Sequence, residues 1–209
     1  MQDTVEPARV SMLKELKSGV HGMLLRYGVD TRRLRPDRIL LERTIFRHLL
    51  DRPEYHRILF VGCAWYTQHY PRWFAQKEFY TIEIDPALAR FGAQRHRIDS
   101  CENIDRHFDT DSLDCVILNG VYGFGLNALP AITRTFEGIH AVLRPGGLFV
   151  FGWNNQPELA PFALAEFETL RRFRETSFPP LGTTQIETAN RNRHTYNFYT
   201  KDPLGAPRL

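Results

Sequence analysis

Small and acidic residues follow two short apolar runs near the middle of the chain. Gly62 and Cys63 come directly after "RILFV", and Glu83 ends the run "FYTIE", 21 residues beyond Gly62. A glycine permits a sharp turn that brings backbone N–H groups toward a ligand. A carboxylate at about that distance can accept hydrogen bonds from both hydroxyls of a ribose. The spacing predicts a nucleoside site; the alternatives are a tight turn without a ligand and a solvated acid.

Two further stretches carry groups suited to a flat ligand. Asp99 and Ser100 follow "HRI". The carboxylate of Asp99 can accept from an exocyclic amine such as adenine N6, and the Ser100 N–H can donate to a ring nitrogen beside it. The same two residues can instead cap the next turn. Asn119 and Gly120 end "LDCVILNG" and open a loop of glycines and aromatic residues, which either approaches a flat ligand or packs on the core.

These residues come together only if the apolar runs are strands of one sheet. The expected strands are 57–62, 79–85, 96–99, 113–120 and 148–153, and the helices between them are about 67–76, 87–93 and 131–143. Continuous apolar runs are typical of parallel strands that are covered on both faces. The alternation predicts an α/β fold with a Rossmann-like, doubly wound, mostly parallel sheet. Ligands of such sheets lie at the carboxyl ends of the strands.

Further elements are predicted on both sides of this region. Apolar residues at helical spacing predict a helix over 8–27, and a second helix that starts at Pro36 and ends at "DRP". After residue 153 we expect a helix over 161–173 and then a C-terminal antiparallel strand pair, 183–189 and 194–201. The domain prediction is an N-terminal helical extension or lid over 1–52 and a Rossmann-like domain over 53–209.

Composition limits the classes of function. Apolar residues make up 43% and charged residues 24%, as in a globular protein with a real core, and the net charge of +3 is too small to indicate nucleic acid. The three cysteines, Cys63, Cys101 and Cys115, fit neither a CxxC pair nor a zinc site, so no metal is predicted. Free thiols, with no signal peptide and no membrane-spanning run, indicate a cytoplasmic protein without a membrane partner.

Residues 57–153 resemble the core of class I S-adenosylmethionine-dependent methyltransferases. The matching pieces are "ILFVGC", "TIEIDP", "IDSCENI", "DSLDCVILNGV" and "LRPGGLFVFGW". The last is among the more specific, because "L-x-PGG" commonly introduces the fifth strand in that family. The resemblance implies S-adenosyl-L-methionine as cofactor. It places Gly62 and Cys63 at the methionine part, Glu83 at the ribose, Asp99 and Ser100 at the adenine, and Asn119 with Gly120 near the sulfonium.

The first turn departs from the family pattern. That pattern, D-x-G-x-G-x-G, is replaced here by Phe60, Gly62, Ala64 and Tyr66. Ala64 is tolerated if its φ is negative, whereas a positive φ would cost about 1 kcal/mol. Tyr66 must turn away from the ligand or replace a lost contact with its hydroxyl. Thr67, or Gln68 beside it, is a candidate donor to the cofactor carboxylate.

The resemblance implies methyl transfer to a second molecule. Because the extra chain is short, we expect a small-molecule acceptor such as a sugar or another secondary metabolite, methylated at oxygen. An oxygen nucleophile often needs a general base, for which the candidates are His69 and His140. Candidate acceptor contacts, which can also be read as packing residues, are Tyr122, Phe124, Trp153 and Asn154. The sequence leaves the oligomeric state open.

Three other functions compete with this interpretation. A degenerate, non-catalytic domain that has lost cofactor binding would explain Phe60 and Tyr66. A nicotinamide dehydrogenase would share the sheet, but the chain lacks G-x-G-x-x-G. A nucleic-acid methyltransferase would carry an Asp/Asn-Pro-Pro-aromatic run after the fourth strand, where "NGVY" stands instead.

Overall fold

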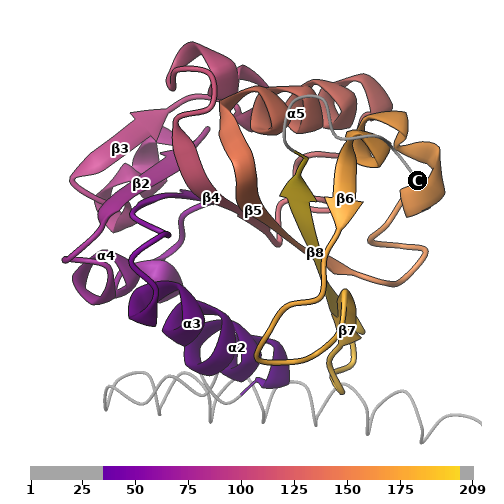
Figure 1. Cartoon of the computed structure of the whole chain (residues 1–209). Coiled ribbons are helices and arrows are strands. Elements are labelled where there is room, and N and C mark those ends of the chain that lie inside the picture. The colour runs from indigo at the N-terminus through magenta and orange to yellow at the C-terminus, as the bar shows by residue number, and fades with distance from the viewer. Residues whose placement is uncertain (1–34, 203–209) are drawn as a thin grey trace, which may run out of the picture.

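The computed structural model describes residues 35–202, and the helix predicted over 8–27 lies outside them. One eight-stranded sheet, with the path β3-β2-β1-β4-β5-β8-β6, runs through the middle of the molecule (Figure 1). Helix α5 covers one face, and α2 and α3 cover the other. The predicted α/β, Rossmann-like sheet with an antiparallel end is confirmed.

The first five strands are parallel to one another. Their bounds are β1 Arg57–Val61, β2 Glu78–Glu83, β3 Arg95–Ile98, β4 Leu113–Asn119 and β5 Leu143–Asn154. Strand β8 (His194–Lys201) lies antiparallel to β5, and both β6 (Phe173–Glu175) and β7 (Gln185–Glu187) pair with its other edge. Because β8 runs against β5, its first residue reaches the edge where β4 and β5 end.

The side chains of the central strands alternate between two cores, as the period of a strand requires. Leu59 and Val61 of β1 face α5 (Leu129–Val142), where Phe136 is fully buried. Ile58 and Phe60 face the opposite way. Both faces of the sheet are therefore apolar, which explains the continuous apolar runs in the sequence.

The second core is completed by the helical segment before β1. This segment runs through α2 (Pro36–Leu40), a π-helical turn (Leu41–Ile45) and α3 (Phe46–Asp51). Its buried side chains are Leu41, Ile45, Phe46 and Leu49. The described part of the predicted extension therefore shares a core with the sheet.

Several predicted helices are shorter than expected. The stretch 67–76 contains a 3-10 turn (Trp65–Thr67) and a short α4 (Tyr70–Trp73), and 87–93 is covered by 3-10 residues Pro86–Phe91. The predicted helix 161–173 is wrong: two 3-10 segments, Leu164–Glu166 and Glu168–Arg172, replace it. Phe167 lies between them with ψ 85°, outside the helical region, because its side chain turns into the core. Within residues 35–202, none of the helices has the length and apolar content needed to cross a bilayer.

Candidate active site

The carboxyl ends of the parallel strands bring the sequence candidates to one edge of the sheet. At the end of β1, Gly62 has φ +89° and donates its N–H to Ile82 O at 2.9 Å. A β-carbon there would lie 3.1 Å from Val121 Cγ2. Both the backbone angle and the space therefore favour glycine at this turn.

Glu83, the last residue of β2, holds this turn in place. Its Oε2 accepts from Cys63 N at 3.0 Å, and its Oε1 accepts from Asp85 N at 3.0 Å. A carboxylate has about four acceptor positions, so each oxygen keeps capacity for a hydroxyl. The Cys63 thiol is buried, which raises its pKa to about 11 and leaves it protonated at neutral pH.

Two apolar side chains lie beside Glu83 on the same edge. Ile84 is 66% exposed, and Ile98, the register partner of Glu83 in β3, is 54% exposed. Exposed isoleucines at the ends of two neighbouring strands can pack on a flat, apolar ring. The sequence prediction did not include them, although both directly adjoin named candidates.

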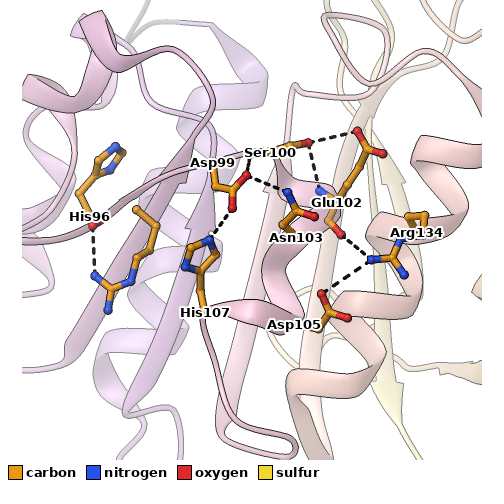
Figure 2. Close-up of polar contacts among 9 residues, drawn as sticks. His96, Asp99, Ser100, Glu102, Asn103, Asp105, His107 and Arg134 are labelled. Carbon is orange, nitrogen blue, oxygen red and sulfur yellow. Dashed lines mark hydrogen bonds and ion pairs between the residues drawn. The ribbon is translucent and has the colours of Figure 1, made fainter.

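Asp99 is the centre of a hydrogen-bond network after β3 (Figure 2). Its carboxylate accepts from Asn103 Nδ2 at 2.8 Å and Ser100 N at 2.7 Å, and His107 Nε2 lies 2.7 Å from its other oxygen. The hydrogen bonds from Asn103 and His107 lower the pKa of Asp99 to about 2. The carboxylate is therefore ionised, and its remaining lone pair can accept a hydrogen bond from an amine.

Ser100 caps the 3-10 segment Cys101–Arg106. Its Oγ accepts from Glu102 N at 3.3 Å, while its own N–H is taken by Asp99. Arg134 of α5 reaches Glu102 O and the Asp105 carboxylate, which ties the capped segment to the helix (Figure 2). The Ser100 Oγ also donates to Glu102 Oε1 at 3.2 Å, so in this structure Ser100 acts as a cap and its N–H is engaged within the chain.

The unusual turn after β1 is free of backbone strain. Ala64 has φ −154° and ψ 165°, an extended conformation open to any residue, so the missing glycine costs nothing there. Phe60 is 2% exposed and packs edge-to-face on Phe46 and Tyr70. The position of the family's acidic residue is thus part of the core.

Tyr66 and Thr67 have roles inside the turn. The Tyr66 ring lies under the guanidinium of Arg38, whose Cζ is 4.2 Å from the ring centroid. Thr67 Oγ1 accepts from Ala64 N at 3.0 Å and donates to Ala64 O at 2.8 Å. The Thr67 hydroxyl is therefore committed to closing the turn, and Arg38 is a neighbour that sequence spacing alone could not reveal.

The ends of β4 and β5 carry a buried polar cluster. Asn119 Oδ1 lies 2.9 Å from His194 Nε2, and Asn154 Oδ1 lies 2.8 Å from His194 Nδ1. Gly120 follows with φ +68° and donates its N–H to Gly152 O at 2.9 Å. Nothing lies within 4 Å of a β-carbon placed on Gly120, so the backbone there is open to a close approach.

The four predicted acceptor residues differ in exposure. Tyr122, Trp153 and Asn154 are buried, whereas Phe124 is 58% exposed. Tyr122 OH donates to Phe162 O at 2.6 Å and accepts from Phe162 N at 2.8 Å. Trp153 Nε1 donates to Asn197 Oδ1 at 2.9 Å. The packing interpretation therefore describes three of these residues in this structure, and Phe124 alone is placed to meet another molecule.

We expect Tyr122→Phe to lower the free energy of unfolding by about 1–2 kcal/mol, because it leaves the Phe162 amide and carbonyl without their hydroxyl partner. Urea unfolding of the variant and the wild type measures this difference. Phe124→Ala is the matched control, since its exposed ring should leave stability within about 0.5 kcal/mol. Equal stability of Tyr122→Phe and wild type would contradict the packing role.

The two histidines proposed as bases occupy different places. His140 lies near the end of α5, which leads directly into the start of β5, at the edge opposite the one that carries Glu83 and Asn119. Burial, with Arg172 and Lys201 nearby, lowers its pKa to about 4. Because of this position we do not propose His140 as the base.

His69 follows the turn after β1 and packs toward the π-helical turn Leu41–Ile45. Its Nε2 lies 3.4 Å from Glu42 Oε1, and its ring contacts the rings of Tyr70 and Trp73. Glu42 also accepts from Tyr70 OH at 3.0 Å. In this structure His69 thus joins the turn to the helical segment before β1, and its Nε2 is buried in that contact.

The sequence profile of a family described as "Methyltransferase domain" matches residues 59–151, from β1 through most of β5. Over these residues the chain is therefore similar to methyltransferase domains, the family that its sequence motifs indicate. The match supports an enzyme that takes its methyl group from S-adenosylmethionine. No curated protein matches the sequence.

Solved structures share the fold of this methyltransferase domain. A TehB-like SAM-dependent methyltransferase from Corynebacterium glutamicum has a TM-score of 0.57 at 16% identity, over 94% of this chain and 100% of that one. The N-methyltransferase NodS from Bradyrhizobium japonicum has a TM-score of 0.55 at 15% identity, over 78% and 97%. NodS with S-adenosyl-L-homocysteine also gives 0.55, at 16% identity, over 77% and 87%. At these identities the likeness concerns the fold.

The residues present fit the cofactor at the ribose and at the first turn. Glu83 retains free lone pairs at the end of β2. Gly62 adopts the positive φ that the sharp turn requires, and Ala64 has an extended backbone. Isoleucines 84 and 98 offer exposed apolar surface beside the carboxylate. Among residues 35–202, no group of three or more histidine, cysteine, aspartate or glutamate side chains is arranged to hold a metal ion.

Proposed function

We propose that the methyltransferase domain transfers a methyl group to a small molecule, at oxygen, with a sugar or other hydroxylated metabolite as the acceptor. The observation that carries the proposal is the convergence of Gly62, Glu83 and Asn119 on one edge of the sheet, at the ends of β1, β2 and β4. When bound, S-adenosylmethionine supplies an electrophilic methyl group on its sulfonium. The chain must bind it, orient the acceptor and exclude water.

Each part of the cofactor is assigned to residues of this chain. Glu83 binds the ribose hydroxyls while it keeps the turn at Cys63 in place. The adenine lies between the exposed isoleucines and near the ionised Asp99. The turn at Gly62 and the open backbone at Gly120 face the methionine part, with Asn119 beside it. Tyr66, held under Arg38, borders this part of the site.

The side chains at the ends of β4 and β5 favour a neutral, hydroxylated acceptor. The amide that an acceptor can reach is that of the half-buried Asn155, whereas Trp153 and Asn154 are buried. An amide both donates to and accepts from a hydroxyl, and the carboxylate that contacts Asn155, that of Glu187, is already paired with Arg193 at 3.0 Å. Phe124, exposed on the loop after β4, contacts the acceptor, and the buried Tyr122 and Trp153 support that loop and edge from below.

Two measurements test the proposal. Isothermal titration with S-adenosylhomocysteine should detect one site, whereas no heat up to millimolar ligand would contradict cofactor binding and favour a non-catalytic domain. The second measurement incubates the protein and S-adenosylmethionine with hydroxylated sugars, phenols and matched amines, and follows the mass of the products. Transfer to the amines alone would contradict methylation at oxygen.

The three free, buried cysteines are consistent with the cytoplasmic location expected from sequence.

A further inference from the structure

The ring of His194 spans the ends of two parallel strands. His194 begins β8, and because β8 is antiparallel to β5, His194 pairs with Asn154, the last residue of β5. Its Nδ1 lies 2.8 Å from Asn154 Oδ1, and its Nε2 lies 2.9 Å from Asn119 Oδ1 at the end of β4. The ring thus connects two strand ends at the edge that carries the candidate active site.

A glycine in β5 makes room for this arrangement. A β-carbon on Gly152 would lie 2.0 Å from Asn119 Oδ1 and 2.9 Å from Tyr196 Cε1. The Asn119 side chain therefore occupies the space above Gly152 and reaches His194 from there. With any larger residue at position 152, Asn119 would have to turn elsewhere.

His194 is also fixed from its other side. The backbone N–H of His194 donates to Asn190 Oδ1 at 3.0 Å, and its backbone carbonyl accepts from both the N–H and the hydroxyl of Thr188. Asn190 Nδ2 in turn donates to Asp37 Oδ1 of α2 at 2.8 Å. His194 and Asn154 are each only 5% exposed. Backbone and ring are both held, so the histidine is a rigid support.

The network also sets the direction of its hydrogen bonds. Burial lowers the pKa of His194 to about 4, so the ring is neutral at pH 7. A neutral imidazole has one N–H donor and one acceptor nitrogen. The two Oδ1 atoms that face the ring cannot both accept from a neutral imidazole, so one of the two amides must turn its NH₂ toward the unprotonated nitrogen. Once the tautomer is set, the imidazole fixes the position of the Asn119 amide.

We infer that His194 is a positioning residue of the methyl-transfer site, which together with Asn154 holds the Asn119 side chain against the methionine part of the cofactor. The ladder between β5 and β8 is formed by backbone groups and does not need these side-chain bonds. A buried polar network that the strands do not require is costly unless every member is satisfied, and satisfied networks fix one geometry. The inference rests on the proposed placement of the cofactor beside Asn119.

Two substitutions at position 194 separate positioning from general stability. A glutamine side chain places its amide where Nε2 stands and keeps the contact with Asn119. An asparagine side chain places its amide where Nδ1 stands and keeps only the contact with Asn154. Each variant loses one hydrogen bond, so H194Q and H194N should lose similar stability in thermal unfolding.

The readout is the affinity for S-adenosylhomocysteine in isothermal titration. We expect H194Q to bind within about twofold of wild type, and H194N to bind about three- to tenfold more weakly. N119A should match H194N, and the double variant N119A/H194N should be no weaker than N119A, because both changes remove the same contact. N154S, which leaves the histidine in place, gives a second measurement of the loosened network.

The outcomes distinguish failure of the positioning role of His194 from failure of the proposed cofactor site. Equal affinity of wild type, H194N and N154S would overturn the positioning role, as would losses that multiply in the double variant. Affinities that follow the melting temperatures of H194Q and H194N, instead of their contacts, would show a merely structural role. If the wild type itself does not bind S-adenosylhomocysteine, the proposed cofactor site fails first, and the inference falls with it.

Discussion

Replacing Glu83 by alanine is expected to weaken the binding of S-adenosylhomocysteine by about 1–3 kcal/mol, which is about five- to 150-fold in dissociation constant. The carboxylate ends β2 and accepts from Cys63 N at 3.0 Å and from Asp85 N at 3.0 Å, with a lone pair left on each oxygen. The variant loses both ribose hydrogen bonds and the support of the turn. Isothermal titration at fixed ionic strength measures the change.

Glu78→Ala is the matched control for this experiment. Glu78 begins the same strand, at the opposite edge, and pairs with Arg57 at 3.3 Å. Its removal should leave the affinity within about twofold, because an exposed ion pair contributes little and the site is a strand length away. Unchanged affinity in Glu83→Ala would refute the ribose role.

An analogue separates the two tasks of Glu83. If the carboxylate binds the ribose, S-adenosylhomocysteine without its 2′-hydroxyl should bind wild type and Glu83→Ala with more similar affinities than the parent compound. If Glu83 acts only by holding the N–H of Cys63, the variant should lose the same factor with both ligands. The comparison therefore tests the contact itself.

The sheet was predictable because its sequence signals are local. Each central strand is covered on both faces, so β1 and β4 read as continuous apolar runs, and α5 shows helical spacing over 14 residues. The C-terminal antiparallel pair was expected from the strand-like segments 183–189 and 194–201, but the pairing of β8 with β5 was not predicted. The short connections were less predictable, because tertiary contacts decide them. Tyr122 takes both polar groups of Phe162 from 40 residues away, and Phe167 breaks the following helix by entering the core.

The candidate site divides in the same way. Gly62, Glu83 and Asp99 were identified because each follows a strand at a recognisable spacing. His194 was missed, since it lies 75 residues from Asn119 and only the antiparallel insertion of β8 brings the two together. Phe60 and Tyr66 looked like defects in the sequence, but Phe60 packs on Phe46 and Tyr66 lies under Arg38. Both partners come from the helical segment before β1, which no local spacing connects to the turn.

The free energy of unfolding is expected to fall in mild acid, and protonation of His194 is expected to cause part of this decrease. Burial lowers the pKa of this histidine from its ordinary value of 6.5 to about 4; the charges of Arg38 and Arg35 act in the same direction, and Asp37 opposes them. Between these pH values the unfolded chain binds a proton that the folded chain excludes. The stability is present in full above about pH 6.5, falls as the pH drops, and is lower by about 3 kcal/mol near pH 4.

Urea unfolding of wild type and His194→Gln between pH 7.5 and pH 4 measures this contribution. Glutamine does not titrate, so the variant should lose stability less steeply, by up to about 1.4 kcal/mol per pH unit below pH 6.5. His140, whose pKa burial also lowers to about 4, remains in both proteins and cancels in the comparison. Parallel curves would mean that folding does not lower the pKa of His194, so that the folded ring is charged below about pH 6.5. In that case both asparagine oxygens would accept from it, and the neutral network that fixes the Asn119 amide would be wrong.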